Sequence, residues 1–237
     1  MRTTEPRISP PRMTAVVVLL LAALVVLSAC SGPDKPTLSP TKTLAAAKKN
    51  LDATSGVRIG LSTRSLPSGV NGLLGADGIG THDPAFTGSI KVSVGGATAD
   101  AKVVAVDGVV HAKLPFTSTF VDIDPADYGA PDPANLMNDQ GGFSSLLTAA
   151  TGVRKGGEVR QGKAVLTSYS AKVPGKAVAA VIPTAKAAAS FAATFTVTDQ
   201  DRLAKAVLTG PFYPKAGDVT YTITFTDYGT KKNITAP

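Results

Sequence analysis

The sequence predicts an α+β domain built on a large, curved antiparallel sheet, with short helices covering its apolar face. About eight to ten segments alternate apolar and polar side chains, which is the period of a half-buried strand. Glycine-containing tight turns join several consecutive segments, as in antiparallel hairpins. In three further segments the apolar residues recur at helical spacing. A sheet with one apolar face needs elements such as these helices to cover it.

The domain is predicted to begin with a helix over residues 39–56, where Ser39 or Thr41 can cap the first turn. The apolar positions on one face of this helix are Leu44, Ala47 and Leu51. A strand over 57–64 follows, because apolar side chains alternate there. Residues 66–86 are rich in glycine and show no clear period, so we expect a loop with room for an irregular strand.

Residues 87–114 carry the clearest strand pattern, three strands joined by two tight turns. Gly95-Gly96 and Asp107-Gly108 are typical of two-residue hairpin turns. The inward positions of the three strands are, in order, Ile90, Val92 and Val94; Ala99, Ala101, Val103 and Ala105; and Val110, Ala112 and Leu114. This segment is therefore predicted to be an antiparallel meander with one apolar face.

An irregular connection is predicted at 124–140, which is rich in Pro, Asp and Asn, and helices and further strands are predicted after it. A short helix is expected within 141–152 and a hairpin over 153–173. Another helix should begin at Pro174 and end at Pro183, since proline suits a first helical turn and cannot continue a helix. Alternation then predicts strands over 191–199, 202–210 and 218–229.

The amino-terminal segment has the features of a secretory signal peptide. Basic residues precede a thirteen-residue apolar run, Ala15–Leu27, which is shorter than the roughly 20 residues of a membrane-spanning helix. Leu27-Ser28-Ala29-Cys30 then resembles the bacterial lipobox. This resemblance implies that residues 1–29 are removed and that Cys30 becomes an S-diacylglycerol and N-acyl anchor on the extracytoplasmic, periplasmic face of the cell membrane. The alternative is an uncleaved anchor with an incidental thiol.

Residues 30–41 are predicted to be a flexible, lipidated tether and residues 42–237 a single domain. Cys30 is the only cysteine, so no intrachain disulfide is expected. Segment 1–29 holds three Arg and one Glu, and its removal lowers the net charge from +7 to +5. That balance suits anionic lipid headgroups. The outward address and the scattered lysines argue against a nucleic-acid partner, and a simply solvated basic surface is the alternative.

Small side chains dominate the inward positions, and the domain contains no tryptophan. Helices and sheet can approach closely across alanines, or the alanines can leave space between them. A dry apolar space is costly unless something fills it, and an acyl chain could do so without polar partners. Periodicity leaves both arrangements open.

Several stretches resemble the mycobacterial LppX/LprA/LprF/LprG lipoproteins, in particular the LprG-like glycolipid carriers. They are 87–114, "VPGKAVAAVIP", "DRLAKAVLTG" and "TYTITFTDYG". The resemblance covers about Thr43 to Pro237. It implies a half β-barrel, a strongly curved antiparallel sheet with helices packed on its concave face around an apolar cavity. It also implies that the protein carries acylated lipids or glycolipids, triacylglycerol among them, toward the outer mycobacterial envelope.

The resemblance places the inward side chains of the strand after Thr87-Gly88 in the cavity wall, and the alternation of the other strands adds further candidates. The predicted lining residues are Ile90, Val92, Val94, Val103, Ala105, Val110, Phe195 and Ile223. Ordinary core packing is the alternative for each. By family analogy a membrane lipid exporter is a possible partner, and the protein is expected to be a monomer without a cofactor other than lipid cargo.

Catalysis and metal binding are not expected. Only two histidines occur, His82 in a loop and His111 on the outward face of a strand, and neither accompanies a G-x-S-x-G motif. Two functions therefore remain: a lipid carrier, or an anchored surface protein whose closed domain binds a protein or a glycan.

Overall fold

The computed structural model describes residues 1, 3 and 38–237, so Cys30, the predicted signal peptide and most of the predicted tether lie outside it. Every described helix and strand, with all of the buried core, belongs to one compact unit, Leu38–Pro237. A segment with its own core can fold by itself. None of the helices between Leu38 and Pro237 is long and apolar enough to cross a membrane.

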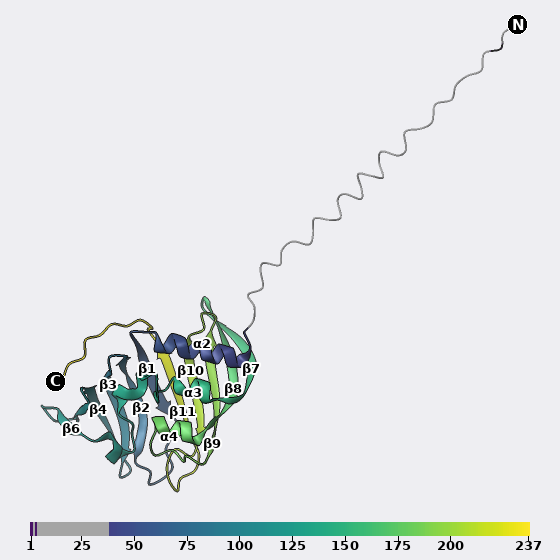
Figure 1. The fold of residues 1–237 in the computed structure, drawn as a ribbon. Helices are drawn as coiled ribbons and strands as arrows, with labels where there is room; N and C mark the ends of the chain where they lie inside the picture. The colour runs from purple at the N-terminus through teal and green to yellow at the C-terminus, as the bar shows by residue number, and fades with distance from the viewer. Residues whose placement is uncertain (2, 4–37) are drawn as a thin grey trace. The chain divides into compact units, whose positions relative to one another are not determined.

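Eleven antiparallel strands form one sheet in the order β6-β5-β4-β3-β2-β1-β11-β10-β9-β8-β7 (Figure 1). The first meander consists of β1 (Gly56–Thr63), β2 (Gly72–Thr81), β3 (Ala85–Val94), β4 (Ala97–Val106), β5 (Val109–Lys113) and β6 (Val121–Ile123). The second consists of β7 (Thr151–Gln161), β8 (Ala164–Pro174), β9 (Ser190–Thr198), β10 (Leu203–Gly210) and β11 (Val219–Thr226). The meanders join where β1 pairs with β11, and β6 and β7 form the two edges, so the sheet is not closed.

The alternating segments of the sequence all form strands at the predicted places. In the β3–β4–β5 meander, Ile90 lies opposite Ala101, and Val103 lies opposite Ala112. The apolar faces of neighbouring strands therefore coincide, as the alternation requires. Strand β6 was not predicted, because three residues are too few for a period to show.

Residues 66–86 were predicted to be a loop with room for an irregular strand, and ten of them form β2, whose register shifts at a bulge between Leu73 and Gly75. Glycine is depleted from strands because it offers no side chain to pack, which hides such a strand from pattern analysis. The structure gives a reason for one of these glycines: a Cβ at Gly78 would collide with the ring of Phe86 on β3. The aromatic side chain of the neighbouring strand fills the space that β2 leaves.

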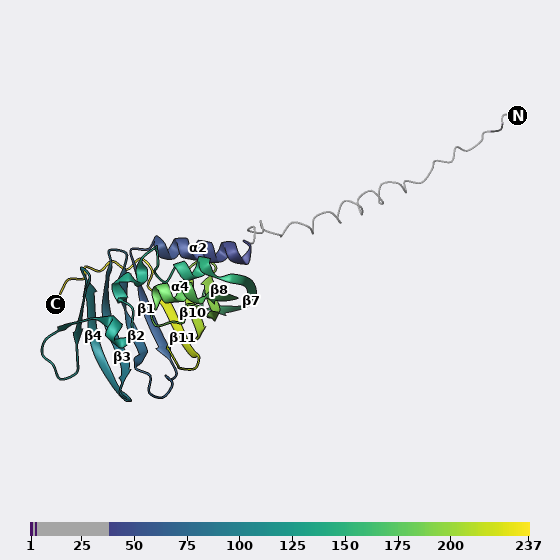
Figure 2. The same cartoon turned by 60° about the horizontal axis from the view of Figure 1, so that its bottom comes forward.

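Helices and 3-10 turns cover different halves of the sheet (Figures 1 and 2). These elements are α2 (Pro40–Asp52), α3 (Ser145–Ala149), α4 (Gly175–Val181), η1 (Pro125–Tyr128) and η2 (Pro133–Met137). Helix α2 contacts β7, β9 and β10, while α3 and α4 contact β8. The η2 turn instead contacts β2, β3 and β4.

The two covers create cores of different size. In the larger core, helix residues such as Leu44, Leu146 and Val178 pack with Phe191 and Phe195 of β9, all of them 0% exposed. The smaller core lies under η2, and its buried members are Phe86, Val103, Ala105, Val110 and Ala134. The half of the sheet under the 3-10 turns is therefore less completely filled than the half under the helices.

Candidate functional site

An apolar cavity of about 390 Å³ lies between the face of β1–β6 and the segment that carries η1 and η2. It extends along β11 and to the end of α4. Every residue that lines it is apolar, a glycine or a tyrosine, and no charged or amide side chain belongs to its wall. Its volume falls within the roughly 300–1,000 Å³ of ligand pockets. Such a wall suits a hydrocarbon and offers almost nothing to a polar ligand.

The cavity is closed at one end and open at the other. On β3 the exposed fraction rises from 2% at Phe86 to 42% at Val94. On β5 it rises from 5% at Val110, and Leu114 just beyond the strand is 48% exposed. β3 and β5 each pair antiparallel with β4, so they run in the same direction and both exposed ends lie at the same end of these strands. The cavity therefore opens beside the β3–β4 turn and the β5–β6 loop, and this opening is its mouth.

Aromatic rings form the wall that separates the cavity from the larger core. Phe212 stacks edge-on against Tyr221 with ring centroids 5.0 Å apart, and Phe143 lies 5.1 Å from Phe225. Behind this wall Phe191 packs against Phe212 at 4.9 Å. Pairs at these distances add stabilisation beyond burial. The rings thus hold a firm boundary that keeps the cavity from collapsing into the larger core.

Two of the three tyrosine hydroxyls in the wall, those of Tyr213 and Tyr221, take part in a closed ring of hydrogen bonds. Tyr221 donates to the carbonyl of Leu73 (2.7 Å), and the Leu73 amide donates to Tyr213 (3.3 Å). The tyrosine oxygens lie 2.7 Å apart, and since Tyr221 has used its proton, Tyr213 is the donor. A side chain at Gly72 would collide with the Tyr213 ring. The ring ties β2 to β11 at a bulge and uses the hydroxyl hydrogens of both Tyr213 and Tyr221.

Burial, followed by the hydrogen bond with Tyr213, raises the pKa of the Tyr221 hydroxyl above its ordinary value. The unfolded chain has the lower pKa, about 10. The contribution of the buried, neutral Tyr221 hydroxyl to the free energy of unfolding is therefore fully present below about pH 10. Above that pH it falls by up to about 1.4 kcal/mol per pH unit. We expect urea unfolding of Tyr221→Phe to lose less stability between about pH 9.5 and 11 than the wild type does. Equal losses in the two proteins would contradict this assignment.

A family model described as LppX_LprAFG lipoprotein matches residues 39–235. The chain belongs to the LppX/LprA/LprF/LprG lipoprotein family. The lipoarabinomannan carrier protein LprG of Mycobacterium tuberculosis (strain H37Rv) is 27% identical over 237 residues, which cover 95% of each chain. LprG of Mycobacterium bovis BCG gives the same values.

Solved structures of this family share the fold. The crystal structure of LprF from Mycobacterium bovis matches with a TM-score of 0.68 at 14% identity, covering 84% of this chain and 96% of LprF. That of LppX from Mycobacterium tuberculosis matches with a TM-score of 0.61 at 14% identity, covering 83% and 98%. The family model confirms the sequence-based assignment to the family, and the solved structures confirm the mostly antiparallel sheet with a few helices.

The predicted lining residues fall into two groups in this family member. Six of them lie in the cavity wall: Ile90, Val92, Val94, Val103, Val110 and Ile223. Ala105 and Phe195 are not in the wall but fully buried, Ala105 in the smaller core and Phe195 in the larger one. Cys30 lies outside the described residues. Lipid contact itself remains a prediction for the six.

Sequence reasoning missed two parts of the wall. One is the aromatic boundary, where Phe212 and Tyr213 follow β10 in a segment without a period. The other is the cover, which runs from Pro125 to Leu136. Its proline and aspartate spacing does signal short turns: Asp124 and Asp132 each accept a hydrogen bond from the amide two residues on. That signal predicts a turn and not what the turn covers.

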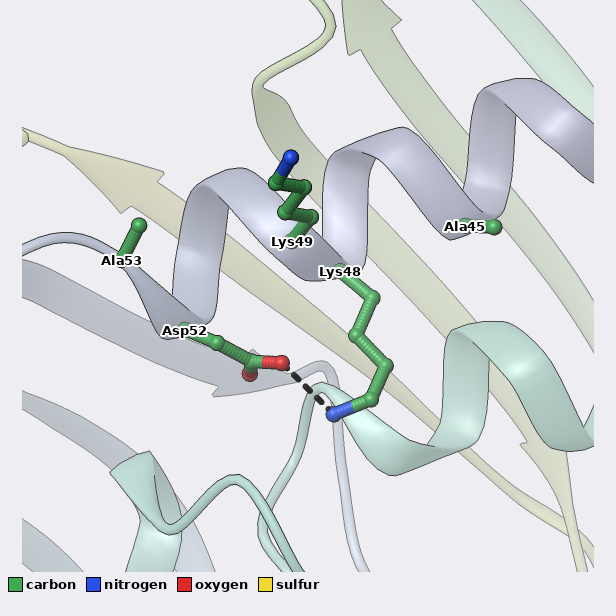
Figure 3. A pocket seen from close by; sticks show the side chains of 5 residues that line it. All are labelled: Ala45, Lys48, Lys49, Asp52 and Ala53. Carbon is green, nitrogen blue, oxygen red and sulfur yellow. Dashed lines mark hydrogen bonds and ion pairs between the residues drawn. The ribbon is translucent and has the colours of Figure 1, made fainter.

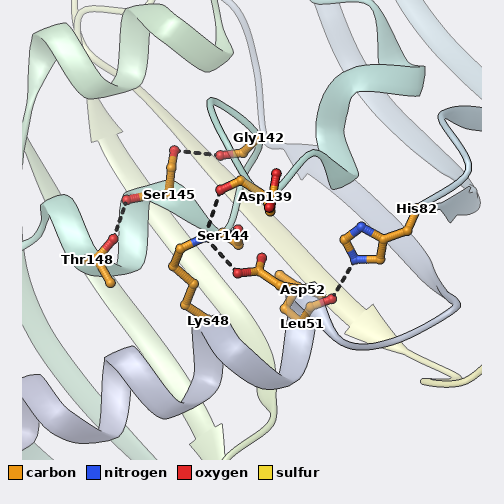
Figure 4. Close-up of polar contacts among 9 residues, drawn as sticks. All are labelled: Lys48, Leu51, Asp52, His82, Asp139, Gly142, Ser144, Ser145 and Thr148. Carbon is orange, nitrogen blue, oxygen red and sulfur yellow. Dashed lines mark hydrogen bonds and ion pairs between the residues drawn. The ribbon is translucent and has the colours of Figure 1, made fainter.

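Neither histidine lines the cavity. His111 pairs with Asp122 at 2.6 Å on the opposite face of the sheet, and His82 donates to the Leu51 carbonyl at 2.9 Å (Figure 4). Within 38–237 no group of three or more His, Cys, Asp or Glu is placed to hold a metal ion. Both histidine contacts have a structural role. The His111 contact joins the neighbouring strands β5 and β6, and the His82 contact joins two segments that are 31 residues apart in the sequence.

A shallow hollow beside α2 is lined by Lys48 and Asp52 with three neighbours (Figure 3). The Lys48 ammonium donates to Asp52 (2.7 Å), to the carbonyl of Asp139 (2.8 Å) and to Ser144 (3.1 Å). All three of its hydrogens are therefore used, and they fasten α2 to the segment before α3 (Figure 4). The residues of this hollow hold two segments of the fold together, so we take the apolar cavity as the candidate site.

Proposed function

We propose that this chain binds the acyl chains of a lipid or glycolipid in the apolar cavity. The observation that carries this proposal is the wall itself: its side chains are apolar, and its two inner hydroxyls are satisfied within the protein. An empty space of this kind stabilises nothing, whereas each buried CH₂ group contributes about 0.8 kcal/mol to binding.

A cavity that is closed at one end and open at the other suits a ligand with an apolar tail and a polar head. The tail would lie against Ile90 and Val103, where the wall is deep, and the head would stay in water beyond Val94. The wall contains no charged side chain that could bind a particular headgroup, so the cavity would accept several lipid classes. Its selectivity would depend on chain number and length.

Family membership supports the rest of the proposal. LprG, which is named a lipoarabinomannan carrier, aligns along nearly the full chain. We propose that Cys30 anchors the protein to the extracytoplasmic face of the cell membrane and that it carries lipid toward the outer envelope. A membrane exporter would be a delivery partner. Two or three acyl chains on Cys30 would hold it stably, whereas one would not.

Native mass spectrometry tests the proposal. The segment Leu38–Pro237, purified from a mycobacterial host, is expected to carry added masses that organic extraction identifies as acylated lipid. A bare protein mass with no extractable lipid would overturn the proposal and favour a closed interaction module instead.

A further inference from the structure

We propose that the β5–β6 loop, residues 114–120, docks the domain on a lipid bilayer, with Phe116 inserted among the lipids and the cavity mouth against the membrane surface. This inference rests on the proposed function and adds to it the surface through which lipid is exchanged. The binding partner that the residues of this loop favour is a lipid bilayer.

The loop presents an aromatic side chain directly to solvent. Phe116 is fully exposed, and its backbone has φ 67°, a left-handed conformation that bulky residues rarely adopt. From Leu114 to Val121 the sequence Leu-Pro-Phe-Thr-Ser-Thr-Phe-Val contains no charged residue. The loop can therefore enter a headgroup layer without dehydrating a charge.

Hydrogen bonds within the loop hold this shape. The Thr117 hydroxyl donates to the Leu114 carbonyl (2.9 Å), and the Lys113 ammonium donates to the Ser118 carbonyl (3.0 Å). Backbone acceptors on either side of Phe116 are thus satisfied by the protein. A segment that leaves water needs such internal partners, because lipid tails supply none.

The exposed apolar surface continues from this loop into the cavity. Four side chains both line the cavity and are 42–49% exposed: Val94, Leu114, Val121 and Tyr128. They come from β3, from the two ends of the loop and from η1, so they surround the mouth. An acyl chain that leaves a bilayer beside Phe116 would meet apolar side chains along the whole path.

Positive charge on the outward face of β4 and β5 complements an anionic membrane. Lys102 and Lys113 lie directly opposite each other on β4 and β5. Like charges in this position repel, and among residues 38–237 neither lysine has a carboxylate within ion-pair distance. Asp122 on the same face is already held by His111. Anionic headgroups would supply the missing partners.

The test compares wild-type Leu38–Pro237 with Phe116→Asp and with the control Val159→Asp. Val159 is also an exposed apolar residue, 66% exposed, but it lies on β7 at the opposite edge of the sheet. Flotation with vesicles of phosphatidylcholine and phosphatidylglycerol measures docking. Uptake of a dye-labelled diacyl phospholipid from the same vesicles measures exchange. Equilibrium binding of a fluorescent fatty acid dissolved in water measures the cavity alone.

We expect Phe116→Asp to lower vesicle flotation and the uptake rate about tenfold or more, while fatty-acid binding is unchanged and Val159→Asp behaves as wild type. Flotation and uptake that are equal in the two variants would overturn the docking inference. So would a wild type that does not float with vesicles, which would assign the loop to a protein partner. A wild type that floats through Phe116 but binds no fatty acid would overturn the proposed function and leave the docking surface in place.

Discussion

Replacing Ile90 by tryptophan is expected to lower binding of a fluorescent fatty acid at least about tenfold while the domain stays folded. Ile90 lies midway along β3, between the closed end at Phe86 and the mouth at Val94, and its side chain faces the cavity. An indole there would occupy the space through which an acyl chain must pass. Because the Ile90 side chain borders the cavity, the larger ring needs no displacement of packed neighbours, which is the usual cost of overpacking.

The neighbouring residue supplies the matched control. Lys91 lies on the same strand but on the opposite face, where it pairs with Asp100 at 3.6 Å. Lys91→Trp introduces the same ring at the same depth of the sheet without touching the cavity. It should bind the fatty acid as wild type does. Equal binding by Ile90→Trp, in a protein whose circular dichroism and unfolding midpoint are unchanged, would show that Ile90 does not line the lipid path.

Truncating Phe195 to alanine is expected to lower the free energy of unfolding by about 3–5 kcal/mol, the range for a buried Phe→Ala change. Phe195 is 0% exposed on β9, in the larger core under the helices. Its loss would leave a void among side chains that cannot move in to fill it. Urea unfolding followed by circular dichroism measures this as a lower midpoint at an unchanged slope.

Ile90→Ala is the comparison for this second prediction, since both residues are apolar and face inward. Ile90 is only partly buried and already borders empty space, so its truncation should cost less than about 2 kcal/mol. Similar losses for the two variants would show that the half of the sheet under η1 and η2 is packed as tightly as the half under the helices. The cavity would then be no larger in solution than ordinary packing defects.

Pattern analysis located most of the sheet correctly, because alternation is set by local geometry. Neighbours on a strand point to opposite faces whatever lies above the sheet, so the side chains of Val103 and Lys102 lie on opposite faces. At β2 it allowed only an irregular strand within a loop, because glycine replaces the side chains that reveal a period, and it missed β6, which is too short to show one. It could not foresee the hydrogen-bond ring at Leu73, whose partners lie 140 and 148 residues away.

The sequence by itself determined the family, the faces of the predicted strands and the apolar character of the inner face. It predicts the lipid anchor at Cys30 from local residues alone. Only the tertiary structure decided which inward side chains meet empty space. Ile90 and Phe195 follow the same alternating rule, yet one faces the cavity beneath η1 and η2, while the other is enclosed beneath the helices. The reason is physical: alternation sets the direction of a side chain, whereas a cavity depends on what the rest of the chain places opposite it.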